Sequence, residues 1–215
     1  MDIKNFAAAV YVFDDTDKLK NHFPARCESY LSEQRREKVN ALRFAEDKKL
    51  SAAAYMLLRA ALKERRGIDE PVVFSFRENG KPFLRDYPNI FFNLSHCREA
   101  AACALSCCEI GVDVQGVAPV TDSLAKRVLT GEEYALFKCS PNPELLFCEY
   151  WTAKESYLKQ TGQGLNMNPG GLAVSGLKGL TAFGRAGRYC GCVSESVPQA
   201  AEIPIIRVPL IEYIK

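Results

Sequence analysis

The stretch FNLSHCREAAACALSCCEIGVDVQ, residues 92–115, contains most of the strand signals that define the fold. The runs IFFNL (90–94), AAACALS (100–106) and IGVDV (110–114) are short and mostly apolar, and only brief connections separate them. Apolar runs of this length, bounded by small or polar residues, are typical of buried strands. We therefore predict three successive strands in the middle of the chain.

Outside this stretch, the sequence predicts further strands and several helices. Leucine and alanine recur at helical spacing over 46–66, and Gly67 has the position of a helix terminator. A strongly basic helix is predicted over 32–44, with Ser32 as its N-cap. Strands are also predicted at 6–13 and 71–76, an Asn-Gly turn at 78–82, helices at roughly 122–138 and 143–161, and glycine-punctuated strands after Gly170.

The predicted elements follow the same order twice: strand, helices and sheet, then strand, helices and sheet. This order predicts an α+β fold built from two similar halves, residues 1–107 and 108–215. No similarity between the sequences of the two halves is visible, so the expected duplication depends on the order of elements alone.

Composition is that of a globular chain and excludes several functional classes. Of 215 residues, 47% are hydrophobic and 25% are charged, and a net charge of +2 is too small to indicate a nucleic-acid partner. The apolar run at residues 6–13 is too short to span a membrane, and its acidic flank does not suit a secretory signal. We expect a cytoplasmic protein that binds neither membranes nor nucleic acid.

The number and spacing of the cysteines also favour a cytoplasmic protein. The chain has nine cysteines but only two histidines, and no CxxC pair occurs, which argues against a structural zinc site. Irregularly placed thiols in a protein that is not exported are expected to be reduced and to pack as small hydrophobic groups.

The stretch WTAKESYLKQTGQGL (151–165) places charges on a helix face that is otherwise apolar. On a helical wheel Lys154 falls inside the apolar arc, while Glu155 and Lys159 lie at its border. A charge on a packed face costs several kcal/mol unless it is paired, so a partner is implied for Lys154. The alternative, that the charged ends reach water at the rim of the core, stays open.

Asp113 is the only charged residue of the apolar strand IGVDV, and Gln115 points to the same face of that strand. A buried aspartate needs a hydrogen-bonding partner or a metal, and a bond to backbone amides at the strand end would also satisfy it. Asp113 and Glu155 together form a small set of hard oxygen ligands, which suits Mg²⁺.

Two long motifs of the chain resemble a known family. FNLSHCREAAACALSCCEIGVDVQ and WTAKESYLKQTGQGL resemble, in order and spacing, the signatures (F/V)NLSHS…GVDVE and WxxKEAxxKxxGxGL of the Sfp-type 4′-phosphopantetheinyl transferases. The upstream ENGKPFL and the basic helix also fit, so the resemblance covers roughly residues 30–168. It implies a pseudo-dimer of two α+β halves, with coenzyme A and Mg²⁺ (or Mn²⁺) in the cleft between them.

The resemblance also implies an activity and its partners. Such an enzyme transfers 4′-phosphopantetheine from coenzyme A to a serine hydroxyl of an apo acyl or peptidyl carrier protein and releases 3′,5′-ADP. We expect a monomer, and a carrier-docking surface within 118–138, where Lys126, Arg127, Val128, Leu129 and Phe137 combine charged side chains with apolar ones expected to be exposed. The alternative, that this stretch is an ordinary pair of surface helices, stays open.

Site roles follow from the matching positions. Asp113 and Glu155 correspond to the metal carboxylates, and Glu155 is the expected base for the serine proton. Lys159 is expected near the reacting centre in an electrostatic role, because a lysine acting as base would have to be neutral. The remaining expected contacts are Lys154 with the pyrophosphate, Ser95 and His96 with the phosphates, Gly80, Lys81 and Pro82 with adenine and ribose, and Arg35 and Lys38 with the 3′-phosphate.

Two positions depart from the family signature. Gln115 stands where the family has glutamate, which removes a negative charge from the metal site, although an amide oxygen can bind Mg²⁺ directly or through a water. Cys97 replaces the serine after His96. Two alternatives therefore stay open: a coenzyme A-binding protein with a degenerate, inactive site, and a metal-dependent phosphohydrolase.

Overall fold

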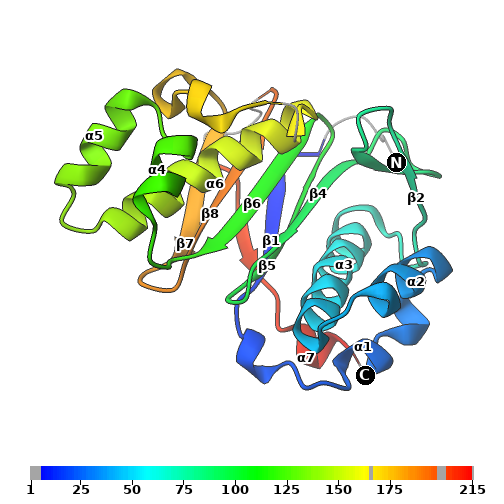
Figure 1. The fold of residues 1–215 in the computed structure, drawn as a ribbon. Helices are drawn as coiled ribbons and strands as arrows, with labels where there is room; N and C mark the ends of the chain where they lie inside the picture. Colours follow the sequence, from blue (N-terminus) through cyan, green and yellow to red (C-terminus); the bar gives the residue numbers. More distant parts are fainter. Residues whose placement is uncertain (1–5, 165–166, 198–201, 215) are drawn as a thin grey trace.

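The computed structural model describes residues 6–164, 167–197 and 202–214, which form an α+β fold with two main sheets (Figure 1). Each main sheet packs against one long helix, which bears out the predicted fold class. Within the described ranges, no helix has the length and apolar character that crossing a membrane requires.

The first sheet has the strand order β4-β5-β1-β9. Strands β4 (Phe91–His96), β5 (Ala101–Ser106) and β1 (Ala9–Phe13) pair antiparallel with one another in this order and agree with three predicted strands. Strand β9 (Ile205–Arg207) pairs parallel to β1, with Val10 opposite Ile205. The end of the chain therefore returns to the sheet that the start of the chain begins.

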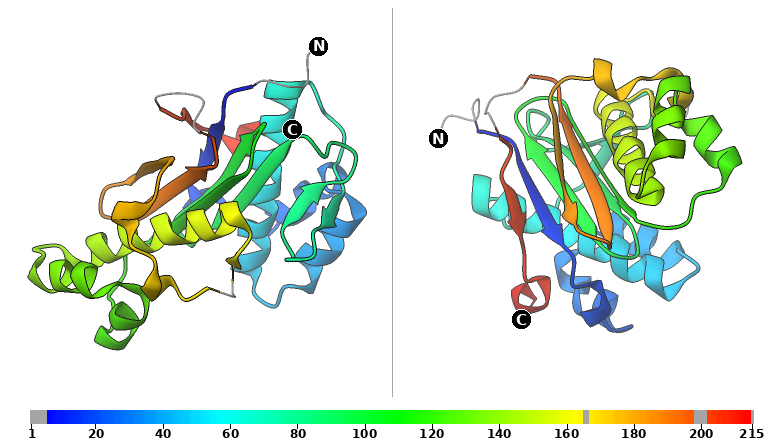
Figure 2. Two further views of the ribbon diagram at one scale, coloured as in Figure 1. Left: turned by 90° about the horizontal axis from the view of Figure 1, so that it is seen from above. Right: turned by 90° about the vertical axis from the view of Figure 1, so that its left-hand side faces the viewer.

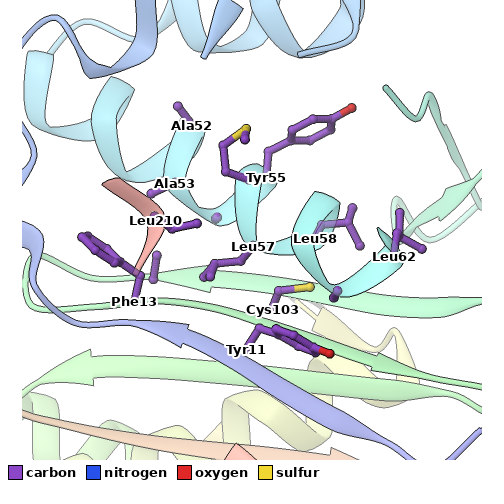
Figure 3. Close-up of a cluster of buried hydrophobic side chains, with 14 of the residues drawn as sticks. Tyr11, Phe13, Ala52, Ala53, Tyr55, Leu57, Leu58, Leu62, Cys103 and Leu210 are labelled. Carbon is purple, nitrogen blue, oxygen red and sulfur yellow. The ribbon is translucent and has the colours of Figure 1, made fainter. Parts of the chain in front are cut away.

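Helix α3 (Ala45–Arg66) covers one face of this sheet and ends at Gly67, whose φ of 69° is a left-handed conformation that glycine adopts readily. Strand alternation sends Tyr11 and Phe13 toward α3, where they join its leucine and alanine side chains in the first core cluster (Figure 3). Cys103 lies fully buried in this cluster, as expected of a thiol that packs as a small hydrophobic group.

The second sheet has the order β6-β8-β7, formed by β6 (Ile110–Gly116), β8 (Tyr189–Glu195) and β7 (Leu180–Arg185). Helix α6 (Pro143–Thr161) packs against it. Gly111 makes this contact possible, because a Cβ at that position would lie 2.1 Å from the carbonyl oxygen of Ser156. A glycine inside a strand is typical of such a close approach by another backbone.

Alternation along β6 divides its side chains between two environments. Ile110, Val112 and Val114 join a second core cluster with the side of β1 that faces away from α3. Gly111 and Asp113 lie on the opposite face, toward α6. The two sheets therefore pack against each other, with α3 outside one and α6 outside the other, as the two views of Figure 2 show.

The remaining elements are short, and some differ from their predicted extent. Residues 122–138 form two helices instead of one segment, because Thr130 and Glu133 make a capping box that starts the second helix. The basic helix ends at Ala41, and the strand predicted at 71–76 is formed only over its last three residues. These elements are η1 (Thr16–Lys18), α1 (Phe23–Arg26), η2 (Glu28–Tyr30), α2 (Glu33–Ala41), β2 (Phe74–Phe76), β3 (Pro82–Leu84), α4 (Asp122–Val128), α5 (Gly131–Cys139), η4 (Pro169–Gly171), η5 (Val174–Gly176) and α7 (Leu210–Tyr213).

Candidate active site

Asp113 lies at the centre of a polar cluster where β6, β4 and α6 meet. Its side chain is buried and accepts hydrogen bonds from Lys159 Nζ at 2.6 Å and Ser95 Oγ at 2.9 Å on the same oxygen, Oδ1. Gln115 Nε2 donates to the other oxygen, Oδ2, at 3.0 Å. The predictions that Asp113 needs a partner and that Gln115 shares its face are both confirmed.

Glu155 lies one turn before Lys159 on α6 and is half-buried. Burial raises the pKa of its carboxyl above the ordinary value, the nearby Asp113 charge raises it further, and Lys159 opposes both. Among the described residues, no cation lies within ion-pairing distance of the Glu155 carboxylate. The two carboxylates are thus close enough to repel each other, and one lacks a direct cationic partner.

This donor set fits a divalent cation of the Mg²⁺ type. The described ranges contain no group of three or more histidine, cysteine, aspartate or glutamate side chains suited to a metal, so a softer multi-ligand site is not formed there. Asp113 and Glu155 offer two carboxylates, and Gln115 retains its amide oxygen because its amide nitrogen makes the bond to Asp113. Mg²⁺ typically takes one or two carboxylates and leaves its other positions to water and phosphates.

Lys154 is not part of this cluster. Its side chain is fully buried, and Nζ donates to Glu133 Oε2 at 2.6 Å, to the Val128 carbonyl at 2.7 Å and to the Pro169 carbonyl at 3.1 Å. The prediction that this charge needs a partner is confirmed. A contact with a pyrophosphate would require the ammonium to leave all three acceptors, so the structure gives Lys154 a role in holding α5 against α6 instead.

Glu133 completes this buried ion pair. Burial pushes the pKa of its carboxyl up, but the hydrogen bonds from Lys154, the Val174 amide and the Thr130 amide outweigh burial and hold the pKa below its ordinary value. The carboxylate is therefore ionised in the folded protein at neutral pH.

The predicted phosphate-binding cations gather at the end of β4. Burial and the neighbouring Arg35 charge lower the pKa of His96, with smaller effects of Asp47, Lys159 and Lys38. The His96 ring is nevertheless exposed at the surface, so an anion could reach it. The structure thus brings His96 within electrostatic range of Arg35, Lys38 and Lys159.

Arg35 is buried, although it belongs to a helix rich in basic residues, whose side chains are usually exposed to solvent. Its guanidinium is buried and donates through one nitrogen to the Ser51 carbonyl at 2.6 Å and to Ser51 Oγ at 3.0 Å, while Nε has no partner. Burial lowers its pKa to about 10, and partial burial together with the Arg35 charge also lowers the pKa of Lys38.

Lys81 joins the loop before β3 to the second half of the chain. Its Nζ donates to Glu109 Oε2 at 2.6 Å, to the Gln160 carbonyl at 2.7 Å and to the Ile110 carbonyl at 3.3 Å. The loop lines a cavity of about 370 Å³ at the C-terminal end of α6. The lining residues are Asn79, Gly80, Lys81, Pro82, Asn93, Leu158, Lys159, Gly162, Gln163 and Gly164.

A second, apolar cavity of about 190 Å³ lies at the other end of α6. Since α6 runs antiparallel to β6, with Cys148 against Gln115 and Gln160 beside Ile110, the two cavities flank the Asp113 cluster on opposite sides. Sequence reasoning did not predict this cavity. Its lining residues are Gln115, Gly116, Ala118, Pro119, Val120, Leu124, Glu144, Phe147, Cys148 and Trp151.

Two family models match adjacent parts of the chain. The model described as "4′-phosphopantetheinyl transferase, N-terminal" matches residues 20–108, and the model of the 4′-phosphopantetheinyl transferase superfamily matches residues 109–181. Together they cover the chain without a gap from residue 20 to residue 181. They meet beside the predicted division at residues 107 and 108.

Curated proteins give the same result. The chain is 32% identical over 142 residues to 4′-phosphopantetheinyl transferase Sfp of Bacillus subtilis, covering 65% of this chain and 63% of that protein. It is 35% identical over 144 residues to 4′-phosphopantetheinyl transferase HetI of Nostoc sp., covering 63% of this chain and 61% of that protein. The L-aminoadipate-semialdehyde dehydrogenase-phosphopantetheinyl transferase of Mus musculus is 28% identical over 165 residues, with 66% of this chain and 53% of that protein covered.

The match to Sfp and HetI thus spans less than two thirds of either relative. The two family matches nevertheless include the NLSH and GVDV strands and the WTAKES helix, and these are the elements that build the Asp113 cluster. The chain therefore belongs to the Sfp-type 4′-phosphopantetheinyl transferase family.

Proposed function

We propose that the protein transfers the 4′-phosphopantetheine moiety of coenzyme A to a serine hydroxyl of an apo carrier protein and releases 3′,5′-ADP. Family membership supports this activity, and the names of Sfp and HetI describe the same type of transferase. The observation that carries the proposal is the cluster of Asp113, Ser95 and Lys159, which joins residues from both family-matched segments around one buried carboxylate.

The order of features along α6 suits the order of groups in coenzyme A. The larger cavity, lined by Gly80 and Pro82, is proposed to hold the nucleotide. The Asp113 cluster would then lie beside the diphosphate, with Lys38 and Lys159 supplying positive charge and His96 close to both. The apolar cavity near Trp151 is on the side where the pantetheine arm would leave the diphosphate.

The residues proposed to hold Mg²⁺, or Mn²⁺, are Asp113, Glu155 and Gln115, the last directly or through a water. Such an ion, when bound, would neutralise the charge that builds up on the departing 3′,5′-ADP. Asp113 is held ready for this role, because Ser95, Lys159 and Gln115 fix both of its oxygens.

Phosphoryl transfer depends on positioning and charge neutralisation. In the proposed step, the carrier serine oxygen forms a bond to the β-phosphorus of coenzyme A, and the bond from that phosphorus to the bridging oxygen of the leaving 3′,5′-ADP breaks. Glu155 takes the hydroxyl proton, directly or through a water, because its carboxylate lies beside Asp113 and has no cationic partner of its own among the described residues. Lys159 acts electrostatically in this proposal, from its position 2.6 Å from Asp113 Oδ1.

The deciding experiment is intact-mass analysis of a panel of apo carrier proteins after incubation with the protein, coenzyme A and Mg²⁺. Addition of one phosphopantetheine to a serine, lost in Asp113→Ala and Glu155→Ala, is the expected result. Hydrolysis of coenzyme A without any carrier would identify a phosphohydrolase instead. Tight coenzyme A binding with no transfer to any carrier would identify a binding protein with an inactive site.

Where the carrier docks is a separate part of the proposal. The apolar residues expected to be accessible within 118–138 are not, because Val128, Leu129 and Phe137 are buried in a third core cluster. Lys126, Arg127 and Leu136 are exposed on α4 and α5, so a carrier with acidic and apolar groups could dock there.

We also propose that the protein works as a cytoplasmic monomer. One chain supplies all the residues of the Asp113 cluster, so the site does not need a second copy. Buried thiols such as Cys27, whose pKa burial raises to about 12, suit a reducing compartment. Light scattering at the concentration of the activity assay would test the oligomeric state.

A further inference from the structure

Side chains, and not a neighbouring strand, form the hydrogen bonds along one edge of β6. One edge of β6 pairs with β8, and the other lies beside β4, which belongs to the other sheet. Backbone groups at an unpaired, buried strand edge need other hydrogen-bond partners. On β6 these groups are the Ile110 carbonyl, the Val112 amide and carbonyl, and the Val114 amide.

Four side chains form hydrogen bonds with these backbone groups. Lys81 Nζ lies 3.3 Å from the Ile110 carbonyl, and Asn93 Oδ1 lies 3.0 Å from the Val112 amide nitrogen. Lys159 Nζ lies 3.2 Å from the Val112 carbonyl, and Ser95 Oγ lies 3.3 Å from the Val114 amide nitrogen. Three of these side chains, those of Lys81, Ser95 and Lys159, were predicted as site residues from the sequence, and Asn93 was not.

Asn93 makes the shortest of these four bonds. Its side chain is only 7% exposed, and it projects from the same face of β4 as Ser95, two residues further along. The bond from the Val112 amide assigns the amide orientation, because only the carboxamide oxygen can accept. Asn93 also lines the cavity of about 370 Å³.

We propose that Asn93 is a positioning residue of the site: its carboxamide oxygen holds the Val112 amide and so sets where the Asp113 carboxylate lies. The inference rests on the proposed function for its effect on turnover. Val112 directly precedes Asp113, and its carbonyl is also held by Lys159, which bonds Asp113 itself. The backbone amide and the backbone carbonyl of Val112 are thus both hydrogen-bonded to side chains, and loss of the Asn93 side chain would leave the amide without this partner.

The test compares three variants. Asn93→Ala removes the acceptor, whereas Asn93→Asp keeps an oxygen at the same position and adds a negative charge to the lining of the cavity. Gln34→Ala is the matched control, because Gln34 is also a carboxamide that bonds a strand backbone, accepting from the Phe74 amide and donating to the Phe74 carbonyl at 3.0 Å each, outside the site. The measurements are amide hydrogen exchange at Val112, Mn²⁺ affinity by electron paramagnetic resonance without nucleotide, melting temperature, and steady-state kinetics.

For Asn93→Ala we expect exchange at Val112 to accelerate about 10-fold, since one hydrogen bond is lost. Mn²⁺ affinity should fall, and kcat should fall about 10- to 100-fold with little change in KM for coenzyme A, because the metal ligand is displaced. Asn93→Asp should restore Val112 protection and most of kcat, but raise KM for coenzyme A, since a carboxylate would face an anionic substrate. Gln34→Ala should lower the melting temperature without changing Mn²⁺ affinity.

Unchanged Mn²⁺ affinity and kcat in Asn93→Ala, with a melting temperature lowered as in Gln34→Ala, would overturn the proposal and leave Asn93 an ordinary structural residue. Failure of Asn93→Asp to restore Val112 protection would overturn it as well. Exchange and Mn²⁺ binding need no turnover. If the wild-type protein transferred nothing to any carrier, the proposed function would fail, while these two measurements would still decide the role of Asn93.

Discussion

Gln115 donates its amide to Asp113, at a position where the family signature has glutamate. Gln115→Glu would place a second carboxylate against Asp113, so without metal we expect the melting temperature to fall by about 2–4 °C, the shift for a change near 1 kcal/mol in a chain of this size. With metal the added charge should lower the half-saturating Mg²⁺ concentration. Thermal scans and Mg²⁺ titrations of activity check both effects, with Gln34→Glu as the control for charge.

An unchanged or higher half-saturating Mg²⁺ concentration in Gln115→Glu would show that residue 115 does not contact the ion. The lower melting temperature without metal would then come only from repulsion between the carboxylates of residues 113 and 115.

His96 gives a prediction about pH. Burial and the Arg35 charge lower its pKa, so the ring is neutral near pH 7 in the free protein. Bound phosphates would counter the neighbouring positive charges and raise this pKa, so between the free and bound values coenzyme A binding should take up protons. Calorimetry in two buffers of different ionisation enthalpy, at slightly acid pH, measures the uptake, and His96→Gln should abolish it. Proton uptake that persisted in His96→Gln would assign it to another group.

At the scale of elements, the contact between α5 and α6 depends on the buried pair of Lys154 and Glu133. Lys154→Met would leave the Glu133 carboxylate buried without its cation, and we expect the free energy of unfolding to fall by about 3–5 kcal/mol. KM for coenzyme A should change little, because Lys154 is fully buried. Denaturant unfolding and steady-state kinetics test this, and adding Glu133→Gln should recover part of the stability. A large rise in KM with unchanged stability would instead favour a pyrophosphate contact.

The contact between α6 and β6 gives a second prediction at this scale. Gly111→Ala would place a methyl group 2.1 Å from the Ser156 carbonyl oxygen, a distance that only movement of the helix can relieve. Overpacking at such a backbone contact should cost at least about 3 kcal/mol of unfolding free energy, or prevent folding. Gly131→Ala is the matched control: no atom lies within 4 Å of the added carbon, and alanine favours the helix that Gly131 begins. Equal stability of the two variants would contradict the close approach.

The long helices were the elements most accessible to prediction. Apolar spacing located α3 and α6 to within a few residues, because leucine, alanine and aromatic residues recur at helical spacing over several turns of each helix. In the structure α3 is buried on all sides from Lys49 to Leu62, whereas α6 alternates between buried and partly exposed residues. The position of the break between α4 and α5 was not predicted, although its signal was present: Thr130 and Glu133 have the spacing of a capping box. Strand β9 is three residues long, and its pairing with β1 joins residues almost two hundred positions apart, which no local pattern specifies.

At the scale of the molecule, the C-terminal segment completes the first sheet and its core. Strand β9 pairs with β1, and Leu210 and Ile214 pack into the cluster beneath α3. We expect Leu210→Ala to lower the free energy of unfolding by about 2–5 kcal/mol, in the range for a fully buried leucine. A chain ending at residue 201 should fail to unfold cooperatively in urea. Cooperative unfolding of that shortened chain would show that residues 1–107 fold without the C-terminal segment, although β9 pairs with β1 in the first sheet.

The sequence alone identified the charged side chains that need a partner in the folded protein. Asp113 in an apolar strand and Lys154 on an apolar helix face each demanded a partner, because an unpaired buried charge is costly in any fold. The identity of each partner depended on long-range packing: Lys159 reaches Asp113 across 46 positions, Glu133 reaches Lys154 across 21, and Asn93 reaches Val112 across 19. The two lysines of one helix thus face different neighbours, one in the proposed site and one in the core, because a helix turns its successive side chains toward whatever packs on each side.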